Sequence, residues 1–296
     1  MIYFTLPTFC YYNKVNNIIH RLVRIETSKL KNPNIMINAQ SGGIPFQCWN
    51  GDINNNIGDG MFYPEFKRLQ ETSELNLRFN FANILLEDYD YYDDLGNTVL
   101  ELFNGTGTLI EISSIPLMEF IQEKYKHYEF IFSKQADIIN PFDKNILDTL
   151  IQQNCFKLIG LPDRMLFDIP LLKTLSNKNK LELTVDPLCP TECSEYSNCM
   201  ITEQQNQLKY SGISIFYNCS KCFPKEQNSQ LISLEQLEET YIPLGFCHFT
   251  FSTSYKNIDK TKQLIFYIQY FFKSEYWNEL IEKGLKILLE GERINE

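Results

Sequence analysis

The sequence of 296 residues predicts an α/β protein with the architecture of a (β/α)8 TIM-like barrel, irregular or incomplete strands being allowed. Short runs rich in β-branched and aromatic residues alternate with helical patterns along the chain, at about 25–30 residues per unit. Eight such runs occur, and eight parallel strands joined by helical crossovers are the number that closes this barrel. An open, doubly wound sheet is the alternative, because it needs no pairing between its first and last strands.

The predicted strands are short apolar runs that end at polar or glycine-containing turns. They cover residues 34–39, 76–81, 107–113, 128–133, 156–161, 181–185, 213–217 and 246–252. Runs such as YEFIFS at 128–133 are dense in aromatic and β-branched residues, as expected for strands that are buried on both faces of a parallel sheet. The first strand along the chain that the sequence predicts is NIMINA at 34–39.

Helical patterns with apolar residues three and four positions apart follow most of these strands. They cover residues 61–74, 93–103, 115–125, 143–153, 169–175, 234–241, 261–272 and 276–289. In the second of them, Leu95, Val99 and Leu102 share one face, and the following Asn-Gly pair ends the helix. We expect one barrel domain over 1–296, with a cysteine-rich insertion at about 187–224 and C-terminal helices at about 261–290.

The stretch from 186 to 224, which follows the sixth predicted strand, contains five of the nine cysteines. Cys189 and Cys193 form a C-x-x-x-C pair, and Cys219 and Cys222 form a C-x-x-C pair. Two close pairs separated by a longer excursion are typical of four thiolates that converge on one metal centre. Iron–sulfur clusters and zinc both accept four thiolates, so the ligand type does not choose between them. Two disulfides, or thiols without a ligand, are the structural alternatives.

The sequence predicts a location in the reducing cytoplasm. The first seven residues lack the charged and apolar regions of a signal peptide, and the longest strongly apolar run, near 264–272, is too short to span a membrane. Clustered cysteines in that compartment favour a metal over disulfides. The formal net charge is −10 and no basic stripe occurs, so we expect no binding of duplex DNA, whereas a local RNA-binding patch is still allowed.

The active site of a (β/α)8 barrel lies at the carboxyl ends of its strands, so polar residues that follow the predicted strands are candidates for a substrate pocket. The first candidates are Asn50, Asp52, Arg78, Asn83 and Asp186. Further residues in equivalent positions are Ser41, Asn80, Ser113, Ser133, Lys134, Asp163, Arg164 and Ser252. Any one of them alone is more commonly a loop or capping residue.

Motifs for hydrolysis and phosphate binding are absent from the sequence. The three histidines, His20, His127 and His248, belong to no H-E-x-x-H motif, and local sequence suggests no Ser–His–Asp or Cys–His arrangement. His248 lies in an apolar run and is expected in the core or in a pocket wall. The C-x-x-x-C-x-x-C motif of radical-SAM enzymes fails at its third position, because five residues separate Cys193 from Cys199.

Three stretches of the chain together resemble one known family. They are IPFQCWNGD at 44–52, LRFNFANILL at 77–86, and the cysteine stretch, DPLCPTEC and YNCSKC, with the segment 233–252 that follows it. They are similar to the collagenase-like peptidase family (peptidase family U32) and to its short, mostly phage-borne relatives. The chain departs from that pattern where Ser194 follows Cys193 in place of a proline.

The resemblance implies a barrel that holds an iron–sulfur cluster, most commonly [4Fe–4S], with zinc as the alternative metal. The implied ligands are Cys189, Cys193, Cys219 and Cys222, with Cys199 as a further candidate because it stands near a histidine position of the relatives. Several family members are linked to oxygen-independent hydroxylation of tRNA, rRNA or quinone precursors. The chain is thus expected to modify RNA or a small molecule, and no residue supports proteolysis.

Two other hypotheses belong to a different functional class. The first is a non-catalytic barrel with a structural zinc site that binds a protein partner. The second is a metal-free barrel remnant of a phage that serves as a binding protein. The metal content of anaerobically purified protein separates the three hypotheses, because each requires a different metal or none.

Overall fold

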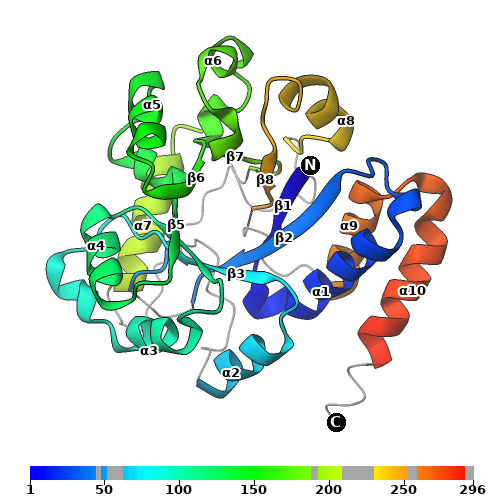
Figure 1. Cartoon of the computed structure of the whole chain (residues 1–296), viewed down its shortest axis with the longest axis horizontal. Helices are drawn as coiled ribbons and strands as arrows, with labels where there is room; N and C mark the ends of the chain where they lie inside the picture. Colours follow the sequence, from blue (N-terminus) through cyan, green and yellow to red (C-terminus); the bar gives the residue numbers. More distant parts are fainter. Residues whose placement is uncertain (45–47, 52–62, 188–192, 209–229, 253–258, 291–296) are drawn as a thin grey trace.

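The computed structural model describes residues 1–44, 48–51, 63–187, 193–208, 230–252 and 259–290. Eight parallel strands close a barrel in chain order, and β8 completes the ring by pairing with β1 (Figure 1). The strands are β1 (Ile2–Leu6), β2 (Ile35–Gly42), β3 (Asn76–Phe81), β4 (Leu109–Ile112), β5 (Glu129–Phe132), β6 (Phe156–Gly160), β7 (Leu181–Thr184) and β8 (His248–Thr250). The predicted fold class is therefore confirmed.

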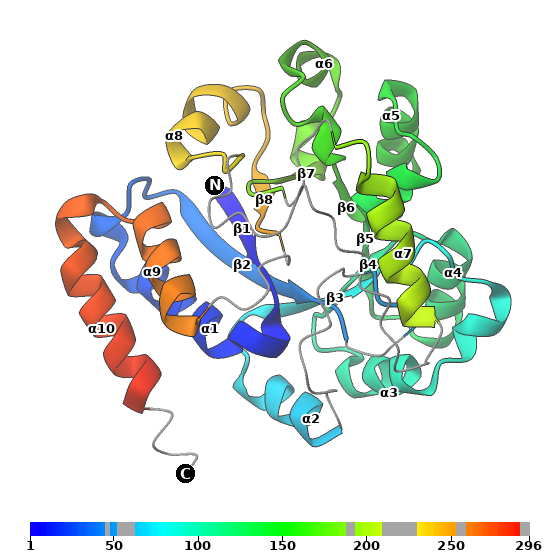
Figure 2. The same cartoon turned by 180° about the vertical axis from the view of Figure 1, so that it is seen from behind.

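Helices surround the strands, as the view in Figure 1 shows. They are α1 (Phe9–Ile25), α2 (Tyr63–Thr72), α3 (Asp94–Phe103), α4 (Ile115–Lys124), α5 (Lys144–Gln153), α6 (Ile169–Thr174), α7 (Tyr196–Leu208), α8 (Leu234–Gln236), α9 (Lys260–Phe271) and α10 (Trp277–Glu290). In the opposite view α7 lies in front of the part of the molecule that contains β4, β5 and α4 (Figure 2), and its hydrogen bonds to the loops after β3 and β5 place it at the carboxyl end of the barrel. Within the described residues, no helix combines the length and the hydropathy that a membrane crossing needs.

The numbering of the predicted strands is wrong by one, because Ile2–Leu6 forms a first strand that the sequence analysis did not assign. This run of five residues has no turn signal before it, which explains the omission. The stretch 213–217, predicted as the seventh strand, lies outside the described residues, and the ring closes without it. The cysteine-bearing segment therefore follows β7, the seventh strand, and not the sixth.

Helix boundaries agree closely with the predicted ones, because polar side chains cap the helix starts. Asp93, Ser114, Asp143 and Asp168 each accept a hydrogen bond from a backbone N–H in the first turn of the helix that follows. The two C-terminal helices occupy Lys260–Phe271 and Trp277–Glu290, in place of the predicted 261–272 and 276–289. The helices α1 and α7 were not predicted.

Along each strand, successive side chains point in turn toward the surrounding helices and toward the barrel interior. Phe79 of β3 contacts Phe9 of α1 and Phe103 of α3, which identifies the outward face of that strand. Its neighbour Arg78 and the β4 residue Glu111 therefore point inward, since side chains alternate along a strand. A small apolar cluster that is separate from the main core shares this inward face, and its members are Leu109, Ile131 and Leu158. The interior thus combines an apolar part with charged groups.

Candidate active site

Charged side chains fill the centre of the barrel. Arg78 is 3% exposed, and its Nη1 lies 2.5 Å from Glu182 Oε2 while its Nη2 lies 2.8 Å from Glu111 Oε2. The hydroxyl of Ser133 donates to Glu111 Oε1 at 2.7 Å. Burial by itself lowers the pKa of Arg78, but the two carboxylates outweigh it and raise that pKa above its usual value. Arg78 is therefore a permanently charged group that is held in place by its partners.

A lysine and an aspartate from neighbouring loops meet at the carboxyl ends of β5, β6 and β7. Lys134 Nζ lies 2.7 Å from Asp163 Oδ1 and donates to Thr184 Oγ1 at 2.7 Å. Both charged side chains are partly accessible, at 23% and 12% exposure. Gly160 allows this approach, because a Cβ at that position would lie 2.9 Å from the backbone nitrogen of Lys134. The pair offers an ammonium group at the mouth of the barrel.

Asp186, two residues beyond the end of β7, is fully buried beside this pair. Its Oδ1 accepts a hydrogen bond from the backbone N–H of Ser252, which follows β8. Burial raises the pKa of Asp186 well above its ordinary value, whereas the N–H of Ser252 and the charge of Lys134 lower it and Asp163 raises it. A carboxyl group with a raised pKa at the mouth of a barrel is suited to donate or accept a proton.

The predicted pocket residues lie in different parts of the structure. Asp186 lies at the mouth, and Arg78 lies buried in the interior. Asn83 is fully buried, and its Nδ2 donates to the backbone oxygen of Cys48 at 2.8 Å, so this side chain joins two loops. Asn50 is also fully buried, and Asp52 lies outside the described residues.

Several of the further candidates do converge. Lys134, Asp163 and Ser252, which follow three different strands, lie near Asp186. Arg164 does not join them, because its guanidinium binds the carboxylate of Asp137 at 2.6 Å and is 43% exposed.

The histidines lie away from this group. His248 is the first residue of β8 and stacks on Tyr3 at the other end of the barrel, with ring centroids 5.0 Å apart. Burial lowers the pKa of His248, although the carboxylate of Glu182 opposes this. His20 Nδ1 lies 3.2 Å from the backbone oxygen of Ile37, and His127 is exposed.

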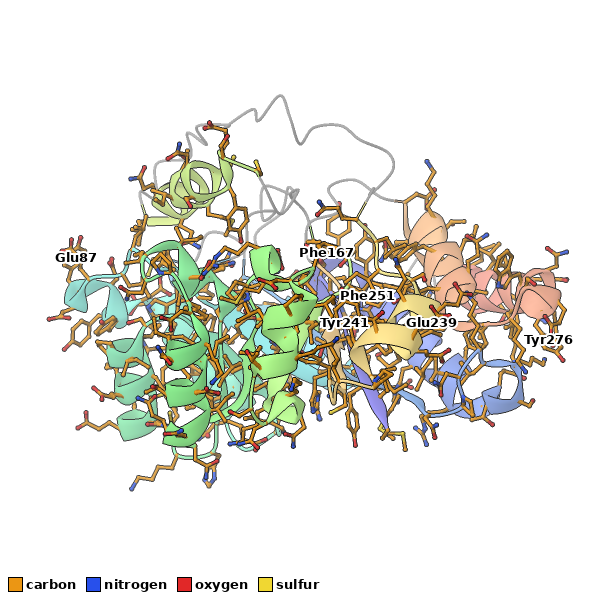
Figure 3. The ribbon with its side chains drawn as sticks, turned by 90° about the horizontal axis from the view of Figure 1, so that it is seen from above. Glu87, Phe167, Glu239, Tyr241, Phe251 and Tyr276 are labelled. Atoms are coloured by element: carbon orange, nitrogen blue, oxygen red, sulfur yellow. The ribbon has the colours of Figure 1, made fainter. Side chains whose placement is uncertain are left out.

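A set of amide side chains that the sequence analysis missed connects α7 to the mouth. Gln204 of α7 accepts a hydrogen bond from the backbone N–H of Ile84 and donates to Gln135 Oε1, both at 2.7 Å. In Figure 3, α7 stands above the rest of the described ribbon, at the end of the barrel that these loops form. The sequence holds no signal for this contact, since a glutamine in a polar helix is usually exposed.

The described ends of the cysteine-bearing segment meet at the barrel mouth. The N–H of Ile232 donates to the oxygen of Val185 at 2.7 Å, so the chain leaves and re-enters the barrel at one place, next to Asp186. Cys193 and Cys199 are half-buried at the start of α7. The other three cysteines of the segment are Cys189, Cys219 and Cys222, and they lie outside the described residues.

The described residues do not test the predicted metal centre, because they include only Cys193 of its four predicted ligands. Within the described residues, no three His, Cys, Asp or Glu side chains are grouped as a metal site. The predicted ligands therefore stay a prediction.

Comparison with known proteins supports the fold. No family model matches the sequence, and no curated protein matches it. A solved structure described as a U32 peptidase is similar to this chain, with a TM-score of 0.54 and 10% sequence identity. The similarity covers 87% of this chain and 95% of that one. The chain therefore has a U32 peptidase-like fold, and at this identity the likeness extends to the fold alone.

Proposed function

We propose that this chain is an iron–sulfur-binding barrel enzyme that modifies a substrate at the barrel mouth by oxygen-independent hydroxylation, with an organic co-substrate that donates the oxygen atom and is thereby reduced by two electrons. The observation that carries the proposal is the position of the cysteine-bearing segment. Its two ends join at Val185 and Ile232, directly beside the buried carboxyl of Asp186 and the ammonium of Lys134. The U32 peptidase-like fold supports the barrel part of the proposal.

Four cysteines would hold the metal centre, and they are Cys189, Cys193, Cys219 and Cys222. When bound, a [4Fe–4S] cluster supplies one-electron redox chemistry, whereas zinc in the same ligand set would be structural. Cys193 stands three residues before the first residue of α7, and its side chain is half-buried.

Asp186 and Lys134 would act on the substrate directly. Asp186 Oδ1 accepts the N–H of Ser252, and burial raises the pKa of this carboxyl group well above its ordinary value. This group would donate its proton to the substrate or take one from it. The ammonium of Lys134, fixed by Asp163 and Thr184, would bind an electron-rich oxygen of the substrate.

A small polar molecule is the first substrate class, because the formal net charge of −10 disfavours contact with a long phosphate backbone. A single RNA nucleotide that is unstacked from a loop is the second class, since it needs no extended basic surface.

Metal analysis of anaerobically purified protein tests the proposal. We expect a brown protein that contains iron and acid-labile sulfide in cluster stoichiometry. Stoichiometric zinc in protein from iron-supplemented cells would instead support a non-catalytic barrel that binds a protein partner. A colourless protein that takes up no iron on anaerobic reconstitution would overturn the proposal.

Mass spectrometry of cells that express the chain tests the reaction and the substrate class. Small-molecule and RNA fractions would be compared for products heavier by one oxygen atom, between wild type and Asp186→Asn. The variant is expected to keep its iron and to lose the product. A product that persists unchanged in the variant would remove Asp186 from the reaction.

A further inference from the structure

The helix α7 turns one stripe of side chains toward the barrel. Tyr196, Met200, Gln204 and Leu208 are spaced by four residues and so share one helix face. Met200 and Gln204 are each 1% exposed, and Leu208 packs against the main core. A buried amide in such a stripe is costly unless every polar atom finds a partner. The contacts of Gln204 therefore decide whether this helix can dock.

Gln204 has partners on two loops of the barrel mouth. Its Oε1 accepts from the backbone N–H of Ile84, after β3, and its Nε2 donates to the side chain of Gln135, after β5. Gln135 in turn donates to the backbone oxygen of Gly51, after β2, at 2.6 Å. Asn83 Nδ2 adds a bond to the backbone oxygen of Gln204 at 3.3 Å. One side chain of α7 is thereby linked to three of the loops at the barrel mouth.

The loops under Gln204 are closely packed, so the network has little room to shift. A Cβ at Gly51 would lie 2.5 Å from Gln135 Oε1 and 2.7 Å from the backbone oxygen of Ala82. The N–H of Asn83 donates to the oxygen of Trp49 at 3.0 Å, which ties the loop after β3 to the loop after β2. Connected and fully satisfied polar networks of this kind favour one arrangement of their elements.

We propose that Gln204 is a positioning residue that docks α7 on the loops of the barrel mouth and so holds Cys193, which precedes this helix, in place. The helix carries this position to its start, because the first helical residue, Tyr196, lies eight positions before Gln204, about 12 Å along the helix axis. Cys193 stands three residues before that point. The docking of α7 needs no metal, and the effect on Cys193 as a ligand rests on the proposed iron–sulfur function.

The competing explanation is that α7 docks through Met200 and Leu208 alone. Gln204→Met separates the two, because methionine has a similar length and an apolar side chain but makes no amide hydrogen bonds. Gln205→Met is the matched control, since Gln205 is the next residue of the same helix and is exposed. Gln135→Met removes the same bond from the other side and leaves the sequence of α7 intact.

Hydrogen exchange on metal-free protein is the first measurement. In Gln204→Met we expect the amide of Ile84 and the amides of 196–208 to exchange about tenfold faster or more, with no change in Gln205→Met. Gln135→Met should accelerate exchange in 196–208, and it supplies this readout if Gln204→Met fails to fold. Equal exchange in 196–208 for all folded variants would overturn the proposal.

Release of iron to a chelator under anaerobic conditions is the second measurement. We expect release about tenfold faster in Gln204→Met than in wild type and Gln205→Met, because α7 and the preceding Cys193 would be held less firmly. Faster exchange without faster iron release would overturn the positioning of Cys193 and leave the proposed function standing. A wild type that binds no iron would instead defeat the proposed function, and the exchange data would still decide whether Gln204 docks α7.

Discussion

Arg78 Nη1 lies 2.5 Å from Glu182 Oε2 in the interior of the barrel, and the two residues belong to strands on opposite sides of the ring. Three strands separate β3 from β7 in either direction, so this ion pair crosses the barrel. Apolar layers occupy this place in most barrels of this type. Here Arg78, Glu182 and Glu111 form a polar layer in the barrel interior, below Lys134 and Asp186.

Removing the interior cation should destabilise the protein strongly. In Arg78→Met two buried carboxylates lose their partner, and we expect the free energy of unfolding to fall by about 3–5 kcal/mol. Urea titration of metal-free protein measures this change. Arg21→Met is the control, because Arg21 is 53% exposed in its pair with Glu74 and should contribute less than about 1 kcal/mol. Similar losses in both variants would contradict an energetic role for the interior pair.

Asp186 should make the stability of the protein depend on pH. Its pKa is raised in the folded state, so the folded protein keeps this proton while the unfolded chain loses it above about pH 4. The free energy of unfolding therefore falls as pH rises, by up to about 1.4 kcal/mol per pH unit from this group, until the pH passes the folded pKa. The Asp186→Asn variant has no ionisable group at this position, so its free energy of unfolding should lack this pH-dependent contribution.

Urea titrations of metal-free wild type and Asp186→Asn between pH 5 and about pH 8 measure the difference. The variant should gain stability over the wild type as pH rises, whereas Asp88→Asn, a change at an exposed carboxylate, should follow the wild type. Parallel curves for wild type and Asp186→Asn would mean that this carboxyl ionises normally when folded.

The fold was predictable because each strand carries its own local signal. Alternating runs such as 76–81 and 128–133 have the length and composition of buried strands, and their recurrence specifies the barrel. Ile2–Leu6 escaped prediction because a strand at the chain start lacks a bounding turn. The helix over Tyr196–Leu208 escaped because its stretch was interpreted through its cysteines, and its buried face includes a glutamine.

Positions in the candidate site could be predicted from the sequence only where the order of strands and loops in the barrel determines them. The strand-end rule indicated Asp186 and Lys134, because it needs no knowledge of side-chain contacts. Pairing of Arg78 with Glu182 depends on barrel closure between residues 104 positions apart, and no local pattern records this. Gln204 was missed for the same reason, since its partners lie far away in the sequence.

A single methyl group at Gly51 should disturb the contact between the loops and α7. The new Cβ would meet the backbone of Ala82 at 2.6 Å and the end of Gln135 at 2.5 Å, so one of them must move. We expect Gly51→Ala to lose about 1–3 kcal/mol of stability and to speed exchange of the Ile84 amide.

Gly105→Ala is the control for the change at Gly51. Gly105 has φ +78° and no atom within 4 Å of an added Cβ, so this variant should lose about 1–2 kcal/mol through backbone strain alone. Exchange of the Ile84 amide should stay at its wild-type rate there. Unchanged exchange in Gly51→Ala as well would show that the loop accommodates the methyl group without moving Gln135.

Single cysteine-to-serine substitutions should distinguish the thiols that bind the metal from those that do not. Cys193→Ser is expected to lose most of its iron, because a four-thiolate centre with one weak ligand is readily lost. Cys199→Ser should keep its iron, since two complete pairs exist without it. Cys155→Ser is the control, because Cys155 is exposed and precedes β6, at the end of the barrel away from the mouth. Iron analysis of anaerobically purified variants measures all three, and loss in Cys199→Ser with retention in Cys193→Ser would exchange their roles.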